Sequence, residues 1–278
     1  MSYKIVVDSC CDLTEELKSD SHFQIIPLTL QVGETYITDD EHFDQARFLE
    51  LVRTSPECPR TACPSPEAFR DAYDCDADMI FVVTLSQHLS GTYNSAVLGR
   101  TMYIEEQGEK QIAVFSSDSA SVGEAKIAMK IRELAEAGKS FDQIVKEVSD
   151  FRDHMNTYFV LETLDYLKKN GRLTGLQALF ATVLNIKPVM GADKGVIIKL
   201  DQARGIDKAL AKMAQWVAKE AKNAEEKILA ISHTNCPERA RMVKDLICSM
   251  IKVKDVYVVD TAGVSTTYAG DGGVIIAL

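Results

Sequence analysis

No apolar run in this chain of 278 residues approaches the ~20 residues that a membrane-spanning helix needs. The N-terminus, MSYKIVVDSC, begins directly as a strand and lacks the layout of a signal peptide. With 46% hydrophobic and 26% charged residues, the chain can bury a sizeable core, and its length favours two domains or one large one. We therefore expect a cytoplasmic protein without stable membrane insertion.

An excess of positive charge is also missing. The formal net charge is −10, whereas the phosphates of nucleic acids favour a basic protein surface. The overall charge therefore argues against a nucleic-acid partner.

Paired cysteine motifs are absent. The seven cysteines are odd in number and form no CxxC pair, which disfavours both a disulfide framework and a zinc site of the usual spacing. We expect free, buried or partly buried thiols at Cys10, Cys11, Cys58, Cys63, Cys75, Cys236 and Cys248.

Common catalytic motifs are missing as well. The sequence has no GxxxxGK[ST] loop, no GxGxxG after a strand, no HExxH and no GxSxG, which disfavours an ordinary α/β-hydrolase among other enzymes. The five histidines are scattered without metal-ligand spacing, so we expect no metal and no cofactor. His88 lies beside the Ser-Gly-Thr turn, where it is either a solvated loop histidine or a general base.

What the sequence does contain is a regular alternation of strand and helix patterns. Buried strand patterns such as KIVVDS and ADMIFVVT are each followed by a helical pattern, which predicts a parallel sheet flanked by helices. In the second half of the chain the alternation of strand and helix patterns is less regular. There, PVMGADKGVIIKL predicts a hairpin with a turn at DKG. We predict an α/β protein of two domains: an N-terminal domain (1–153) with a mainly parallel sheet, and a C-terminal α/β domain (154–278) with a mixed or antiparallel sheet.

Three predicted strands of the N-terminal half end in hydroxyl-bearing residues. The segments are VDSC, TLSQHLSGT and FSSDSAS. In open parallel sheets, ligands bind beyond the carboxyl ends of the strands. We therefore expect these three ends to converge on one ligand-binding edge.

The segment LSGTYNSA begins a predicted helix. Ser90 stands where an N-cap residue would stand, a structural role worth ~1 kcal/mol. The same geometry suits an anion, because a helix N-terminus offers free N–H donors and Gly91 lets the backbone come close. A second hydroxyl cluster, RTACPSP, contains Thr61 and Ser65. Thr61 either organises its turn or, together with Ser90, holds the two oxygens of one carboxylate.

From end to end the chain resembles the DegV family of bacterial fatty-acid-binding proteins. The matching segments are VDSCCDL, IIPLTL, RTACPSPEAF, TLSQHLSGTYNSA, SSDSAS, LDYLKKNGRLTG, LNIKPVM and a glycine-rich C-terminal segment. Of these, LSGTYNSA and LKKNGRLTG are the more specific.

The resemblance implies a long-chain fatty acid, such as palmitate, stearate or oleate, held between two domains. It implies a carboxylate held by Thr61 and Ser90, with main-chain help near Gly91. It also implies a basic residue from the second domain, for which Arg204 in KLDQARGIDKAL matches best. In several members the bound acid is presented to a separate fatty acid kinase, so the resemblance implies a carrier without catalysis of its own.

Two departures from the family pattern concern the ligand carboxylate. The family commonly has TSQPS where this chain has TACPS, so Thr61 remains but the neighbouring hydroxyl and amide are lost. Tyr268, in TTYAGDGG, stands where a histidine near the carboxylate is usual, and Asp271 replaces a proline. A tyrosine can donate a hydrogen bond but cannot be cationic.

Several interpretations stay open at this stage. An enzyme of the hydrolase or acyl-transfer class would use Ser90 with His88, and an anion-binding module would take a phosphorylated metabolite. The apolar runs YFVLETL and LQALFATVLNI are either plain core, which periodicity favours, or the lining of a tunnel, which the resemblance favours. Arg172 in NGRLTG would contact an anion or a partner, or would form a buried salt bridge.

Overall fold

The structure is a computed structural model that describes residues 1–173 and 185–278. The apolar run LQALFATVLNI, interpreted above as either core or tunnel lining, lies almost wholly outside the described residues. In the described ranges, no helix combines the length and the apolar character that crossing a membrane requires.

The first half is built on a four-stranded sheet in the order β2-β1-β6-β7. All of its pairings are parallel. Its strands are β1 (Tyr3–Asp8), β2 (Phe23–Ile26), β6 (Met79–Thr84) and β7 (Gln111–Ser116). The six residues of β6 are all buried, as expected for a central strand covered on both faces.

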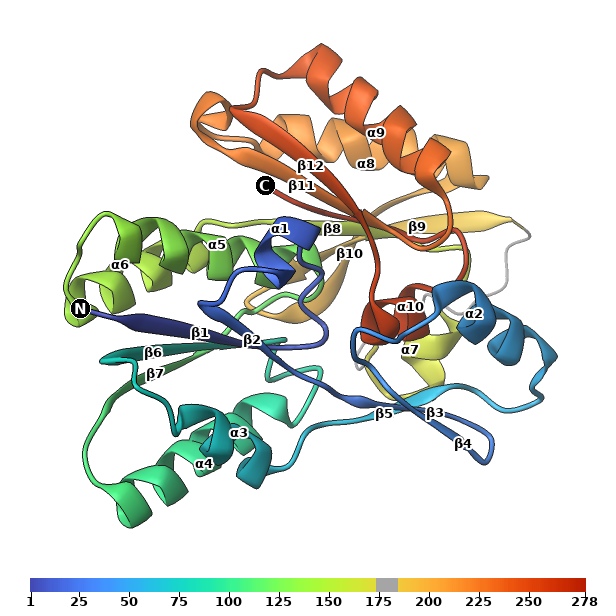
Figure 1. The fold of residues 1–278 in the computed structure, drawn as a ribbon. Coiled ribbons are helices and arrows are strands. Elements are labelled where there is room, and N and C mark those ends of the chain that lie inside the picture. The colour runs from blue at the N-terminus through green and yellow to red at the C-terminus, as the bar shows by residue number, and fades with distance from the viewer. Residues whose placement is uncertain (174–184) are drawn as a thin grey trace.

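Helices cover both faces of this parallel sheet (Figure 1). On one side lie α3 (Pro66–Tyr73) and α4 (Thr92–Gln107), and on the other lie α5 (Val122–Glu136) and α6 (Phe141–Asp153). The short α1 (Glu15–Lys18) follows β1. Its N-cap is Thr14, whose side chain accepts a hydrogen bond from the N–H of Leu17.

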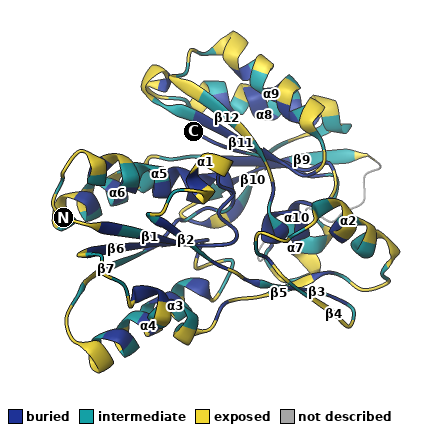
Figure 2. Cartoon of the chain, in the orientation of Figure 1, coloured by how far each residue is buried: buried dark blue, intermediate teal, exposed yellow. Residues whose placement is uncertain are grey.

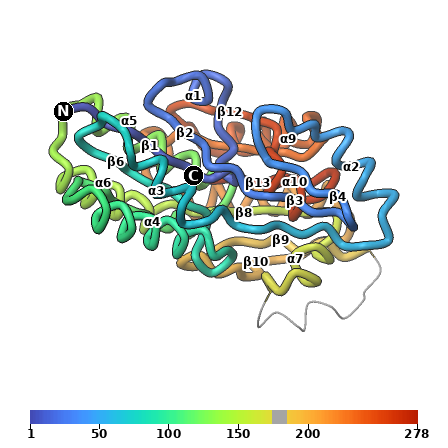
Figure 3. The backbone as a smooth tube through the Cα atoms, turned by 60° about the horizontal axis from the view of Figure 1, so that its bottom comes forward, coloured from blue at the N-terminus to red at the C-terminus, as the bar shows by residue number. Residues whose placement is uncertain are grey.

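Pro27 marks the point at which the chain leaves the parallel sheet. The residues after it form β3 (Thr29–Val32) of a separate antiparallel sheet in the order β4-β3-β5. Its other strands are β4 (Thr35–Thr38) and β5 (Arg60–Ala62), and α2 (Gln45–Thr54) connects them. Figures 1 and 3 both place this small sheet and α2 near α7 (Asp165–Lys169) and α10 (Gly263–Ala269), far from the N-terminus.

The second half contains a six-stranded sheet in the order β10-β9-β8-β13-β11-β12. Only β11 and β12 pair in parallel, and the other pairings are antiparallel. The strands are β8 (Thr157–Val160), β9 (Ile186–Asp193), β10 (Val196–Arg204), β11 (Ile228–His233), β12 (Asp255–Asp260) and β13 (Val274–Ala277). The helices α8 (Ile206–Glu220) and α9 (Pro237–Met250) cover its outer face, with a 3-10 helix at Ala224–Glu226 between α8 and β11 (Figure 1).

The predicted fold class is confirmed: a parallel sheet flanked by helices is followed by a mixed α/β half. The hairpin at PVMGADKGVIIKL is also confirmed, because β9 and β10 pair across a turn in which Lys194 and Gly195 have positive φ. The boundary between residues 153 and 154 stays a prediction.

Helix α5 lies between the two large sheets and contacts strands of both, β1 and β6 on one side and β11 and β13 on the other. Nine of its 15 residues are buried, so it serves as a shared core layer. In Figure 2 the strands β1, β6 and β11 are largely dark blue, whereas α6 and α9 carry much exposed surface.

Lys126 is buried within this shared layer and should make stability depend on pH. Its Nζ donates to the carbonyl oxygens of Ile228 (2.7 Å) and Ala277 (3.5 Å), and burial, with a smaller effect of Lys227, lowers its pKa to about 7. The unfolded chain binds more protons above that pKa, so the free energy of unfolding should rise by about 2 kcal/mol from pH 7 to pH 9. Urea unfolding at the two pH values measures this rise.

The matched variants for this prediction are Lys126→Met and Lys208→Met, the second of an exposed lysine. The Met variant at 126 should lose the rise between pH 7 and pH 9, and the variant at 208 should keep it. An equal rise in all three proteins would contradict a buried, neutral Lys126.

Candidate functional site

A cavity lies where the C-terminal ends of β1, β6 and β7 meet the mixed sheet and α10. The empty space between its lining atoms, including the part that is open to solvent, is about 830 Å³. Apolar side chains from both halves of the chain make up most of the wall, for example Leu28, Leu85, Phe159, Ile197 and Ile275. Such a site can enclose an apolar molecule away from water.

The predicted convergence of strand ends is confirmed. Cys10 after β1, Leu85 after β6 and Ser119 after β7 all line this one cavity. They meet because the three strands are parallel neighbours, so their carboxyl ends share one edge of the sheet.

Polar side chains gather in one part of the wall. The hydroxyls of Thr61 and Tyr268 are 2.8 Å apart, and the guanidinium carbon of Arg172 lies 5.6 Å from the centre of the Tyr268 ring. Arg172 also donates through Nε to the carbonyl oxygen of Leu89 at 3.1 Å. All three side chains line the cavity together with Ser90. Burial raises the pKa of Tyr268, so its hydroxyl keeps its proton at neutral pH and can donate.

Ser90 lines the cavity but is not the N-cap of α4. That position is taken by Gly91, which makes no side-chain capping bond. The Ser90 hydroxyl lies 2.9 Å from the Thr92 hydroxyl and accepts from the N–H of Thr92 at 3.3 Å. One lone pair of Ser90 is thus used within the turn, and its hydroxyl proton is available to another acceptor oxygen when Thr92 is the donor of their shared hydrogen bond.

Two residues chosen from the sequence do not line the cavity. Gly91 is exposed, although its backbone adjoins Ser90. Arg204 is exposed at the end of β10, where it pairs with Ile186 on the neighbouring strand. Among the described residues, Arg172 and not Arg204 is the basic residue that lines the cavity.

The geometry required of a serine nucleophile and its base is not formed by Ser90 and His88. His88 is exposed, and its backbone N–H donates to the Ser86 hydroxyl at 3.2 Å. Within the described ranges, no hydrogen bond joins the His88 ring to Ser90, whose hydroxyl pairs with Thr92 instead. The arrangement suits holding an anion better than attacking a carbonyl.

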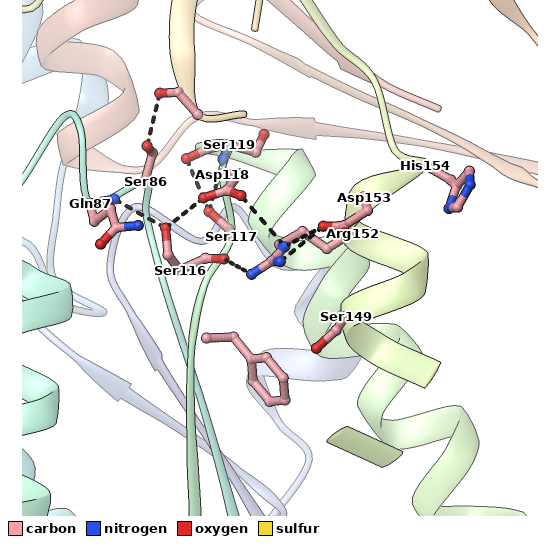
Figure 4. Close-up of polar contacts among 12 residues, drawn as sticks. Ser86, Gln87, Ser116, Ser117, Asp118, Ser119, Ser149, Arg152, Asp153 and His154 are labelled. Atoms are coloured by element: carbon pink, nitrogen blue, oxygen red, sulfur yellow. Dashed lines mark hydrogen bonds and ion pairs between the residues drawn. The ribbon is translucent and has the colours of Figure 1, made fainter. Parts of the chain in front are cut away.

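The turn after β7, in the predicted hydroxyl-rich segment FSSDSAS, has a polar network that includes Arg152 of α6 (Figure 4). Asp118 has a positive φ of 51°, accepts from the Ser116 hydroxyl at 2.9 Å and lies 3.5 Å from Arg152 Nε. The Ser116 hydroxyl in turn accepts from the N–H of Gln87 at 3.2 Å. These contacts fix the turn, which presents Asp118 and Ser119 to the cavity.

The tip of the β9–β10 hairpin closes the cavity from the other half. The carbonyl oxygen of Gly195 accepts from the Ser86 hydroxyl at 2.8 Å. Gly195 also lines the cavity. The hairpin therefore joins the mixed sheet to the end of β6. No local sequence pattern predicts this contact.

The small antiparallel sheet is tied to α10 by a buried carboxylate. Asp39 accepts from the N–H groups of Gly263 (2.7 Å) and Val264 (2.9 Å) at the start of the helix. Burial raises the pKa of Asp39 to about 6. Since α10 carries Tyr268 and β5 carries Thr61, this tie helps to hold the two hydroxyls together.

Asp12 makes the corresponding link between the segment after β1 and the second half. It accepts from the N–H of Ala262 at 2.7 Å and from the hydroxyl of Ser121. The Ser121 hydroxyl also lies 2.6 Å from that of Ser232 on β11. The cavity is therefore framed by buried polar contacts between residues far apart in the sequence.

Comparisons with known proteins agree over the whole chain. The family model described as "Uncharacterised protein, DegV family" matches residues 2–278. A DegV domain-containing protein of Streptococcus gordonii is 33% identical over 278 residues, which cover 99% of this chain and 98% of the relative.

Two solved structures share the fold. A DegV family protein from Ruminococcus gnavus, refined with vaccenic acid, is 50% identical, with a TM-score of 0.98 and 100% of both chains covered. The fatty acid kinase (Fak) B3 protein of Streptococcus pneumoniae, loaded with linoleic acid, is 29% identical, with a TM-score of 0.90 and coverage of 100% of this chain and 99% of that one. Because the family match extends over essentially every residue, this chain belongs to the DegV family.

Proposed function

We propose that this protein binds a long-chain fatty acid in the cavity between its two halves. The observation that carries the proposal is an apolar cavity with a cluster of hydroxyls and one guanidinium in a single part of its wall. The relatives from Ruminococcus gnavus and Streptococcus pneumoniae, solved with vaccenic and linoleic acid, support it. Palmitate, stearate and oleate belong to the same ligand class.

In this proposal the carboxylate is held by Thr61, Ser90, Tyr268 and Arg172. The three hydroxyls can donate to carboxylate oxygens, and Arg172 supplies the positive charge that we expected from Arg204. Tyr268 lies between Thr61 and Arg172, so it can replace a histidine as donor while the guanidinium provides the charge.

The acyl chain supplies most of the affinity. Burying each methylene is worth roughly 0.8 kcal/mol, so about fifteen of them give on the order of 12 kcal/mol before the costs of ordering. The polar cluster adds less free energy and mainly fixes which end of the ligand lies near Arg172.

The protein acts as a carrier and not as a catalyst in this proposal. It presents the bound acid to a separate fatty acid kinase, as the name of the Streptococcus pneumoniae relative suggests. The cavity needs no cofactor for this role. Among the described residues, the Ser90 hydroxyl pairs with Thr92 and makes no hydrogen bond with the His88 ring, which agrees with this role.

Removing both central hydroxyls tests the proposed carboxylate site. The double variant Thr61→Ala, Ser90→Ala should bind palmitate about 10- to 100-fold more weakly, because each hydrogen bond to a charged group contributes roughly 1.5–3 kcal/mol and the other donors partly compensate. Competition against a fluorescent fatty acid measures the affinity. The variant Ser249→Ala, at an exposed serine of α9, is the matched control and should bind normally.

Native mass spectrometry of the protein purified from bacteria tests the ligand class itself. A retained mass of fatty-acid size is expected. An apo mass together with no binding of added palmitate or oleate would refute fatty-acid binding. Unchanged affinity of the double variant would show instead that the carboxylate is bound by other residues.

A further inference from the structure

Behind the cavity wall, three ligand-type side chains converge on one point. The carboxylate oxygens of Asp8 and Glu124 and the Sγ of Cys10 include atoms that all lie within 4.8 Å of one another. Asp8 ends β1, Cys10 follows two residues later, and Glu124 belongs to the first turn of α5. The exposed fractions of the three residues are 0%, 2% and 0%, in the order Asp8, Cys10, Glu124.

Glu124 is the anomaly in this group. Neither of its carboxylate oxygens has a hydrogen-bond partner in the described part of the chain, although both are buried. A buried polar atom without a partner is costly, and a buried charge without one is more so. An unseen partner at this point is therefore the physical expectation.

The Asp8 side chain makes no hydrogen bond with Glu124 among the described residues. Its two oxygens accept from neutral backbone groups, the N–H of Cys10 (2.9 Å) and the N–H of Leu85 (2.9 Å). These bonds orient the carboxylate and leave each oxygen a further lone pair. Two carboxylates and one thiol thus face each other without a positive charge from their own hydrogen bonds.

We propose that Asp8, Cys10 and Glu124 bind one divalent cation of the zinc class. A set of one thiolate and two carboxylates suits zinc, which accepts sulfur and oxygen ligands in a small tetrahedral shell. Magnesium and calcium prefer oxygen alone, so the cysteine disfavours them. The Cys10 Sγ also lies 3.8 Å from the Ser265 hydroxyl, which is the partner that a cation would have to compete with.

The position gives the cation a structural role beside the ligand cavity. Cys10 lines that cavity, whereas Asp8 and Glu124 do not. A bound cation would therefore join the end of β1 to α5 immediately behind the wall. The site differs from the proposed fatty-acid carboxylate site at Thr61, Ser90, Tyr268 and Arg172, and neither proposal depends on the other.

Metal content tests this inference on the full-length protein. Zinc is supplied during expression and again during refolding, because the three side chains are buried, and loosely bound metal is then removed by gel filtration. We expect about one zinc per chain by elemental mass spectrometry. Glu124→Gln and Cys10→Ser should each lower the metal retained at least about tenfold. Cys248→Ser, at an exposed cysteine, is the matched control and should retain it.

A second measurement on the unmodified protein covers the case in which a variant fails to fold. Refolding with cobalt in place of zinc should give the near-ultraviolet charge-transfer band of a cobalt–thiolate bond. Less than about a tenth of an equivalent of zinc, or cobalt without that band, would overturn the proposal. The partner of Glu124 would then be a proton shared between the two carboxylic acids. Equal loss of zinc in Cys248→Ser would overturn it too.

Discussion

Ala192→Trp is expected to reduce the affinity for palmitate about 1000-fold while an eight-carbon acid loses much less. Ala192 lies on β9, lines the cavity and is only partly buried, so a larger side chain at this position extends into the space for the acyl chain. Displacing about five methylenes forfeits ~4 kcal/mol at ~0.8 kcal/mol each. A strand accepts tryptophan readily, so the fold should tolerate the change.

The measurement is competition by saturated acids of increasing length against a fluorescent fatty acid. Val196→Trp is the control, since Val196 belongs to the same hairpin, is 41% exposed and does not line the cavity. The control should bind every acid normally. If Ala192→Trp binds long acids as the parent protein does, the acyl chain lies elsewhere.

Gly195→Ala is expected to destabilise the protein by about 3 kcal/mol and to weaken fatty-acid retention. Gly195 has a φ of +81°, a backbone conformation that costs a residue with a Cβ roughly 1–2 kcal/mol. An added Cβ would also clash with the Ser86 Oγ and come 3.1 Å from the Asp118 Cα. The hairpin tip must therefore move away from β6, which breaks the Ser86–Gly195 hydrogen bond and opens the cavity wall.

Gly138→Ala separates the two contributions to this effect. Gly138 has a similar φ of +74°, but nothing lies within 4 Å of the added Cβ, so only the backbone cost of about 1 kcal/mol should appear. Urea unfolding gives both stabilities, and native mass spectrometry gives the retained ligand. Equal losses in the two variants would show that the hairpin does not press against Ser86 and Asp118.

The part of the site formed by neighbouring parallel strands could be predicted from the sequence. The ends of β1, β6 and β7 could be expected to meet because parallel strands in sequence order tend to be neighbours. Their polar residues are then placed at one edge by the alternation of strand and helix alone. The hairpin at 194–195 was also predictable, because its DKG segment supplies Gly195, which adopts a positive φ without steric cost.

Pro27 shows the limit of such local reasoning. Pro27 lies within one continuous apolar segment, FQIIPLTLQVG, but the residues on its two sides belong to different sheets. Thr61 reaches the site only because β5 pairs with β3, opposite Leu30. Arg172 and Arg204 were both candidates, and only the packing of the second half shows that one lines the cavity while the other is exposed.

By itself, the sequence determined the α/β class, the order of the main elements and the hydroxyl-rich edge, since propensity and hydrophobic periodicity are set by residues close together in the chain. Tertiary structure alone decided the contact between Thr61 and Tyr268, the role of Asp12 between the halves and the convergence of Glu124 on Asp8 and Cys10. Those contacts join residues about 110 to 250 positions apart, and their free energy depends on burial and distance, which no local pattern specifies.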